Sequence, residues 1–155
     1  MKILGFRGDP KAPRYAIVSE IGGVYTLENS SGDTKLSAPA SITEDADAER
    51  LEWLYREIHR IFDDHPDVAK VMIKGNEFTQ QDTKAKRRSF YNDGAVMLAC
   101  AHRGIPVEIK VYASIGTAKA KSKELGEARV GRTAKYWDEK MADAVNAAWW
   151  GLRHP

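Results

Sequence analysis

The sequence of 155 residues contains a single cysteine, which excludes an intramolecular disulfide and a zinc site built on cysteines. Cys100 lies within the apolar run Ala95–Ala101 and is therefore expected to be a small buried side chain rather than a nucleophile. No stretch approaches the roughly 18 apolar residues of a membrane-spanning helix. The N-terminal residues become charged too soon for a signal peptide. We therefore expect a cytoplasmic protein with no membrane partner.

The sequence also lacks the common motifs of nucleotide-binding proteins and covalent catalysts. It has no Gly-Lys-Ser/Thr phosphate loop, and Gly5–Pro10 offers only a Gly-x-x-Gly pattern. The four histidines are not spaced as metal ligands, and no serine or cysteine is placed as an activated nucleophile. No cofactor is expected from these residues.

Composition and charge indicate one ordinary globular domain covering residues 1–155. Hydrophobic residues make up 43% and charged residues 30%, and the formal net charge is only +2. The distribution of charge is more informative than its sum. Acids concentrate between Thr43 and Asp67, whereas bases concentrate in Lys84–Arg88 and in Lys119–Lys135.

Hydrophobic periodicity predicts three strands at the start of the chain, Lys2–Phe6, Arg14–Glu20 and Val24–Glu28, with a turn at Gly22-Gly23. These strands should form an antiparallel meander. The next elements are a helix ending near His65, a strand Val68–Ile73, a helix Lys86–Arg103, a strand Val107–Val111, a basic helix Thr117–Leu125, a flexible link Gly126–Lys135 and a final helix Trp137–Leu152. The first helix should bury Leu51, Leu54, Ile58, Ile61 and Phe62, and the second should bury Phe90, Gly94, Met97, Leu98 and Ala101.

Strands that alternate with helices after a meander predict an α/β protein with a mixed sheet flanked by helices. Local segments resemble the RuvC-type Holliday-junction resolvase branch of the ribonuclease H-like fold. They are Ile3-Leu4-Gly5 with Tyr15-Ala16-Ile17-Val18, Val71-Met72-Ile73, Gly94–Ala101 with Ile105-Pro106-Val107 and Ile115-Gly116, and Ala142–Ala148. The resemblance implies a ribonuclease H-like sheet, a three-stranded antiparallel meander plus two parallel strands.

The resemblance also implies a catalytic site of metal-binding acids, and this sequence departs from it there. Arg7 and Lys74 occupy the acid positions that follow the first and fourth strands, and Lys140 replaces one of two acids in the last helix. Only Asp143 remains. Cations attract phosphate but cannot hold Mg²⁺, which prefers oxygen ligands. We therefore expect a non-catalytic nucleic-acid-binding protein of bacterial or phage type, with a phosphate-attracting site in place of the metal site.

Two alternatives stay open. Asp9, Glu77 and Glu139 lie close in sequence to the replaced positions, so strand slips could bring them together with Asp143. The chain would then be a Mg²⁺- or Mn²⁺-dependent structure-selective nuclease. Alternatively, the Trp149-Trp150 pair in the last helix could dock a partner, and a homodimer is one such arrangement.

The predicted nucleic-acid interface extends beyond Arg7, Lys74 and Lys140. A basic cluster at the start of the second helix suits phosphate neutralisation without base readout, and Lys119 adds a further cation. We expect DNA as the partner in preference to RNA. The cluster consists of Lys84, Lys86, Arg87 and Arg88.

Overall fold

The computed structural model describes residues 1–155 and is built around one five-stranded sheet with the strand order β3-β2-β1-β4-β5. The first three strands, β1 (Lys2–Arg7), β2 (Arg14–Ile21) and β3 (Val24–Leu27), are antiparallel. The other two, β4 (Val68–Lys74) and β5 (Val107–Lys110), run parallel to β1. This topology confirms the predicted mixed sheet.

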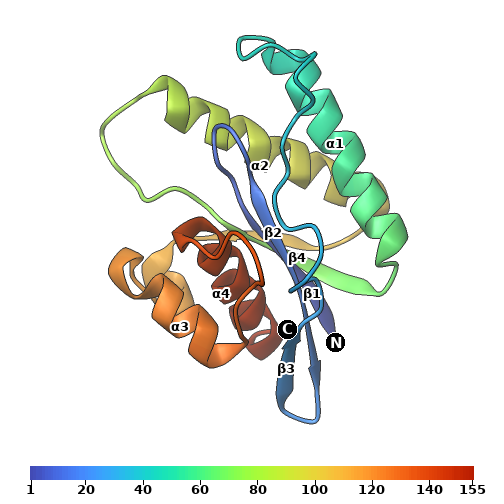
Figure 1. The fold of residues 1–155 in the computed structure, drawn as a ribbon, viewed down its shortest axis with the longest axis vertical. Helices are drawn as coiled ribbons and strands as arrows, with labels where there is room; N and C mark the ends of the chain where they lie inside the picture. The colour runs from blue at the N-terminus through green and yellow to red at the C-terminus, as the bar shows by residue number, and fades with distance from the viewer.

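Helices cover both faces of the sheet (Figure 1). One face carries α1 (Asp47–Asp64) and α2 (Lys84–Arg103), which pack against each other. The other face carries α4 (Glu139–Arg153), with α3 (Ser122–Arg129) packed against it. Two short 3₁₀ turns lie between β5 and α3, at Tyr112–Ile115 and Lys119–Lys121. None of the helices is both long and apolar enough to cross a membrane.

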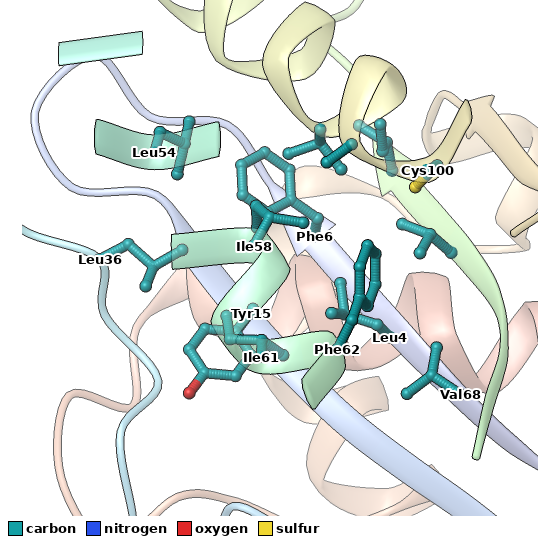
Figure 2. Packing of buried hydrophobic residues seen from close by; sticks show 14 of the residues in the cluster. Leu4, Phe6, Tyr15, Leu36, Leu54, Ile58, Ile61, Phe62, Val68 and Cys100 are labelled. Carbon is teal, nitrogen blue, oxygen red and sulfur yellow. The ribbon is translucent and has the colours of Figure 1, made fainter. Parts of the chain in front are cut away.

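The larger hydrophobic core lies between the sheet and α1 and α2 (Figure 2). Leu54, Ile58 and Ile61 of α1 are almost fully buried, as their helical spacing predicted. They pack in one cluster with Phe6 of β1. Cys100 of α2 is fully buried in the same cluster, which confirms its assignment as a structural side chain.

The second core forms where α4 lies on β1, and small residues allow the close approach. A Cβ atom placed on Gly5 would lie 1.9 Å from the carbonyl oxygen of Ala144 and 2.9 Å from the Cβ of Ala148. No larger residue than glycine therefore fits at this point of β1 without moving α4. The helix begins at Glu139 because the Asp138 side chain caps it by accepting the Met141 N–H.

The predicted buried face of α2 is wrong. Met97 and Leu98 are 39% and 53% exposed, and Phe90 is also exposed. The buried face is largely polar, and it consists of Arg88, Ser89, Asn92, Asp93, Val96, Ala99 and Cys100. The polar residues are accommodated because several find partners; Asn92 Nδ2, for example, donates to the Asp9 carbonyl over 2.8 Å. The apolar stripe of α2 therefore faces outward.

The segment after β5 also differs from its prediction. The predicted helix Thr117–Leu125 begins later, and α3 continues through Arg129 into the stretch predicted to be a link. Gly126 explains part of the difference. A Cβ there would lie 3.2 Å from the Trp137 ring, so the glycine lets α3 pack tightly on the segment before α4.

Candidate functional site

The candidate site lies where β1 and β4 end side by side. Arg7 and Lys74 are the last residues of these strands and are direct partners in the parallel register. Because they are in register, their side chains leave the same face of the sheet. This is the face covered by α4, which brings Asp143 to the strand ends. The structure thus confirms that Arg7 and Lys74 converge, and Asp143, the acid that remains in the last helix, lies beside them.

The Arg7 guanidinium is enclosed by acceptors. Its Nε lies 3.1 Å from Asp143 Oδ2, and its side chain is only about one-tenth exposed. A terminal nitrogen donates to the carbonyls of Gly8 and Lys74 over 3.1 and 3.4 Å, and to Asn76 Oδ1 over 3.0 Å. Arg7 therefore ties the ends of β1 and β4 to α4.

Lys74 is fully buried, and its charge is compensated within the protein. Its Nζ donates to the Gly75 carbonyl over 2.6 Å, pairs with Glu77 Oε1 at 3.0 Å, and lies 3.7 Å from the centre of the Tyr112 ring. Burial lowers the pKa of Lys74, and the hydrogen bond with Glu77 opposes that shift. Because Lys74 has no exposed surface, an external phosphate cannot reach its ammonium group in this conformation.

Asp143 is the acceptor at the centre of the network and is also fully buried. Its Oδ2 accepts from Arg7 and from the Tyr112 hydroxyl over 3.0 Å, and its Oδ1 accepts from the Ser122 hydroxyl over 2.6 Å. Asn146 in turn donates to Ser122. Burial and the adjacent Asp143 raise the pKa of Tyr112, which keeps this hydroxyl a donor.

Lys140 lies apart from this buried network and takes a different partner. Its Nζ is 3.3 Å from Asp9 Oδ1, and its side chain is one-third exposed. The other Asp9 oxygen accepts the backbone N–H groups of Lys11 and Ala12. Burial alone would raise the pKa of Asp9, but these N–H groups and Lys140 together lower it.

The carboxylates of the alternative site do not fit a divalent metal, because three of them already accept hydrogen bonds or pair with cations of the protein. Asp143 accepts from three side chains, Glu77 from Lys74 and a backbone N–H, and Asp9 from two backbone N–H groups and Lys140. Glu139 lies in the first turn of α4. No three acidic, histidine or cysteine residues cluster as metal ligands anywhere in the chain. The β1–β4 register is also regular at its Arg7–Lys74 end, so no slip brings the acids together there.

The basic cluster at the start of α2 is largely paired with acids, most of them distant in sequence. Lys84 lies 2.9 Å from Asp45, and Arg87 lies 2.5 Å from Asp82. Both pairs are exposed. Arg88 is buried and pairs with Asp45 at 3.0 Å and with Glu44 at 3.1 Å. Arg88 thus anchors the segment before α1 rather than facing solvent.

Lys86 and Lys119 are the members of the predicted interface that have no acidic partner. Lys86 donates to the Thr79 hydroxyl and, over 3.2 Å, to the Gln81 carbonyl in the segment before α2. Lys119 is exposed at the start of a 3₁₀ turn. These two cations are free to contact an external anion.

The aromatic pair in α4 is covered by the protein's own cations. Arg129 and Arg153 lie 4.0 and 5.1 Å from the centre of the Trp149 ring. Trp150 stacks on His154 with their ring centres 3.9 Å apart. Both tryptophans are half-buried, so neither presents a free face comparable to that of α2.

Asp93 belongs to this region and was missed by the sequence analysis. It is 3% exposed, its Oδ1 has no hydrogen-bond partner, and burial raises its pKa to about 7 against the opposing charges of Arg7 and Lys74. Asp93 lies three residues after Phe90 and four before Met97, so it borders the predicted apolar stripe, and a single acid at such a border is ordinarily exposed. Tyr112 and Ser122 were also missed, since hydroxyl groups in loops give no periodic signal.

Comparison with known proteins supports the fold. No family model matches the sequence, and no curated protein matches it. Among solved structures, Thermus thermophilus RuvC in complex with a Holliday junction substrate matches with a TM-score of 0.78 at 16% identity, covering 99% of this chain and 96% of that one. A second Thermus thermophilus RuvC structure gives 0.76 at 14%, with the same coverage. The yeast mitochondrial Holliday junction resolvase gives 0.58 at 13%, covering 98% and 80%.

The chain is therefore an α/β protein with the ribonuclease H-like fold. Within that class its fold is similar, over nearly the whole chain, to that of the two RuvC structures.

Proposed function

We propose that this protein binds nucleic acid, DNA in preference to RNA, and does not cleave it. The proposal that the protein does not cleave nucleic acid rests on the buried ion pair between Arg7 and Asp143 at the strand ends. The Arg7 guanidinium is paired with Asp143, the one carboxylate that remains at a position where the resolvases resembled by this chain have a metal-binding acid. Glu77 and Asp9 nearby are paired with Lys74 and Lys140. Two-metal hydrolysis needs several free carboxylates around paired ions.

The fold supports the first half of the proposal. The solved structures that share it include a RuvC in complex with a Holliday junction substrate and a fowlpox virus resolvase in a complex with Holliday junction DNA. These complexes are why we place DNA before RNA.

The buried network of Arg7, Lys74, Glu77 and Asp143 carries no net charge with which to attract phosphate. It is formally neutral, because Asp143 and Glu77 balance Arg7 and Lys74. The phosphate contacts are therefore made by the exposed basic side chains around this network. Lys86 and Lys119 are unpaired, and Lys84, Arg87 and Lys140 have partners that phosphate could replace. Exposed ion pairs contribute little to stability and are screened by salt, so this exchange costs little.

The binding test compares two triple variants with the same change in charge. Lys84, Lys86 and Arg87 are replaced by Ala in one, and in the control Arg56, Arg60 and Arg103 are replaced by Ala. The control residues are paired with acids of α1. Fluorescence anisotropy with labelled junction, duplex and single strands should show weaker binding only in the first variant. Its slope of log affinity against log salt should become shallower by roughly 0.7–0.9 for each phosphate that the variant no longer neutralises. Equally weakened binding in both variants would refute this interface.

The absence of cleavage is tested separately. Labelled junction and duplex are incubated with the protein and Mg²⁺ or Mn²⁺. We expect intact substrate. Metal-dependent cleavage that disappears in both Glu77→Gln and Asp143→Asn would overturn the non-catalytic proposal and establish the nuclease alternative. Cleavage that persists in both variants would identify a contaminating nuclease.

The outward apolar face of α2 supports self-association into a homodimer. Tyr91 and Leu98 are 41% and 53% exposed, and with Leu51 and Tyr55 of α1 they line a groove of about 570 Å³. Contiguous apolar surface of this kind is typical of interaction sites. Because α1 and α2 cover the face opposite to α4, a second copy here would leave the Arg7 end of the sheet free.

A further inference from the structure

A second cavity opens beside the buried network, between α2, the segment after β4 and the end of β5. Its volume is about 590 Å³, within the range of pockets that hold small ligands. Phe90 and Met97 of α2 and Ile109 of β5 give it apolar walls. Its polar lining groups are Asn76, Asp93, Lys110 and Ser114. The cavity is distinct from the groove between α1 and α2, although Phe90 borders both.

Asp93 is the unusual member of the lining. It is almost fully buried, and neither carboxylate oxygen accepts a hydrogen bond from the protein; Oδ1 is enclosed, so Oδ2 is the oxygen that a ligand can reach. The loop after β1 lies directly against it, since a Cβ on Gly8 would come within 2.6 Å of Oδ1. A buried acceptor without a partner costs free energy, and such groups are rare unless a ligand supplies the missing donor.

The charge and the apolar walls of the cavity favour a nucleobase over the phosphate backbone as its ligand. Lys110, the one cation of the lining, is paired with Glu108 at 3.0 Å, whereas the Asp93 carboxylate has no cation bound to it and repels phosphate, so the cavity suits a base better than the phosphate backbone. A planar base suits the apolar walls, and Phe90, which is 53% exposed, offers a ring for stacking. Carboxylates in nucleic-acid complexes accept hydrogen bonds from amino groups on base edges.

We propose that this cavity takes one unpaired nucleobase of a bound strand, with the amino edge of the base on Asp93 and its ring against Phe90. The proposal rests on the nucleic-acid binding proposed above and adds a subsite that reads a base. Cytosine, adenine and guanine carry a suitable amino group, whereas thymine and uracil do not. The protein should therefore prefer unpaired amino-bearing bases.

The test uses single strands of equal length and equal phosphate number, made of oligo-dC, oligo-dT or an abasic backbone. Anisotropy should show oligo-dC binding wild type roughly tenfold more tightly than the abasic strand, the typical effect of stacking one base. Oligo-dT should lie between them. Met97→Trp, which fills the cavity from a partly exposed position, should reduce the affinity for oligo-dC to the abasic level. Ile21→Trp, at the exposed end of the hairpin between β2 and β3 and outside both the cavity and the groove, is the control and should change nothing.

Asp93→Leu removes the acceptor while keeping the branching and the number of heavy atoms, and it should abolish the preference for oligo-dC over oligo-dT. Asp63→Asn, which removes an exposed acid of α1, controls for the change in charge. If wild type binds the abasic strand as tightly as oligo-dC, or if Met97→Trp has no effect, the base subsite is refuted while nucleic-acid binding stands. If no strand, junction or duplex is bound at low salt, the proposed function is refuted together with it.

Discussion

Replacing Asp93 by Asn should stabilise the protein, and increasingly so as the pH rises. The carboxyl of Asp93 has an ordinary pKa of 3.8 and a folded-state pKa of about 7, raised by burial and opposed by Arg7 and Lys74. A carboxyl whose pKa is higher in the folded state than in the unfolded state is harder to ionise in the fold, so the fold loses stability as the pH rises between the two pKa values. That stability is present below about pH 4 and is lost as the pH climbs to about 7.

The magnitude follows from the same two pKa values. Each pH unit corresponds to about 1.4 kcal/mol, so ionising Asp93 inside the fold costs about 4 kcal/mol by pH 8. Solvent screening reduces this cost little, because the residue is 3% exposed. An asparagine side chain cannot ionise and avoids the cost. The effect is a large fraction of the roughly 5–15 kcal/mol by which domains are stable.

The assay is urea unfolding of wild type and Asp93→Asn, followed by circular dichroism at several pH values between about 5 and 8. The difference in unfolding free energy should grow by about 1.4 kcal/mol per pH unit and level off above about pH 7. Comparing the two proteins matters because the pKa of His59 is lowered by burial and by Arg103, which gives an opposite trend in both. A difference that stays constant with pH, or an Asn variant less stable at pH 8, would refute the reasoning.

Two further outcomes follow from the ion pair and from the outer face of α2. Arg7→Met should destabilise the fold by about 3–5 kcal/mol, because it leaves Asp143 charged and buried, and adding Asp143→Asn should recover part of that stability; strictly additive effects in urea unfolding would argue against the pair. Leu98→Glu should shift sedimentation from dimer to monomer, whereas Ile21→Glu, at the 78% exposed end of a hairpin, should not. A wild type that sediments as a monomer at high concentration would exclude the homodimer.

The sheet was predictable because its strands are short apolar runs in an order that few topologies accept. That order places β1 beside β4, and the resemblance to the resolvases predicted that Arg7 and Lys74 follow these strands at equivalent positions. The buried face of α2 was not predictable, because periodicity assumes that apolar residues face the core. Here Asn92 and Asp93 face inward and Leu98 faces outward, which reverses the assumption.

The candidate site was predictable in its location and not in its contacts. The sequence shows a cluster of basic residues at Lys84–Arg88. It cannot show that Asp45, 39 residues before Lys84, pairs with both Lys84 and Arg88. Similarly, Ser122 and Tyr112 reach Asp143 only because α3 and the turn after β5 fold back onto α4. Contacts of this kind depend on tertiary packing, which local patterns do not encode.

The interlocking of Arg7, Asp143, Lys74 and Glu77 also restricts how this chain can change by single substitutions. An aspartate in place of Arg7 would put two carboxylates side by side in a buried position with no cation between them. A glutamate in place of Lys74 would leave Arg7 as the sole cation facing three acids. Each first step toward a metal-binding cluster therefore passes through a protein with an uncompensated interior charge. Building a metal-binding cluster at this position would therefore require changing several residues together.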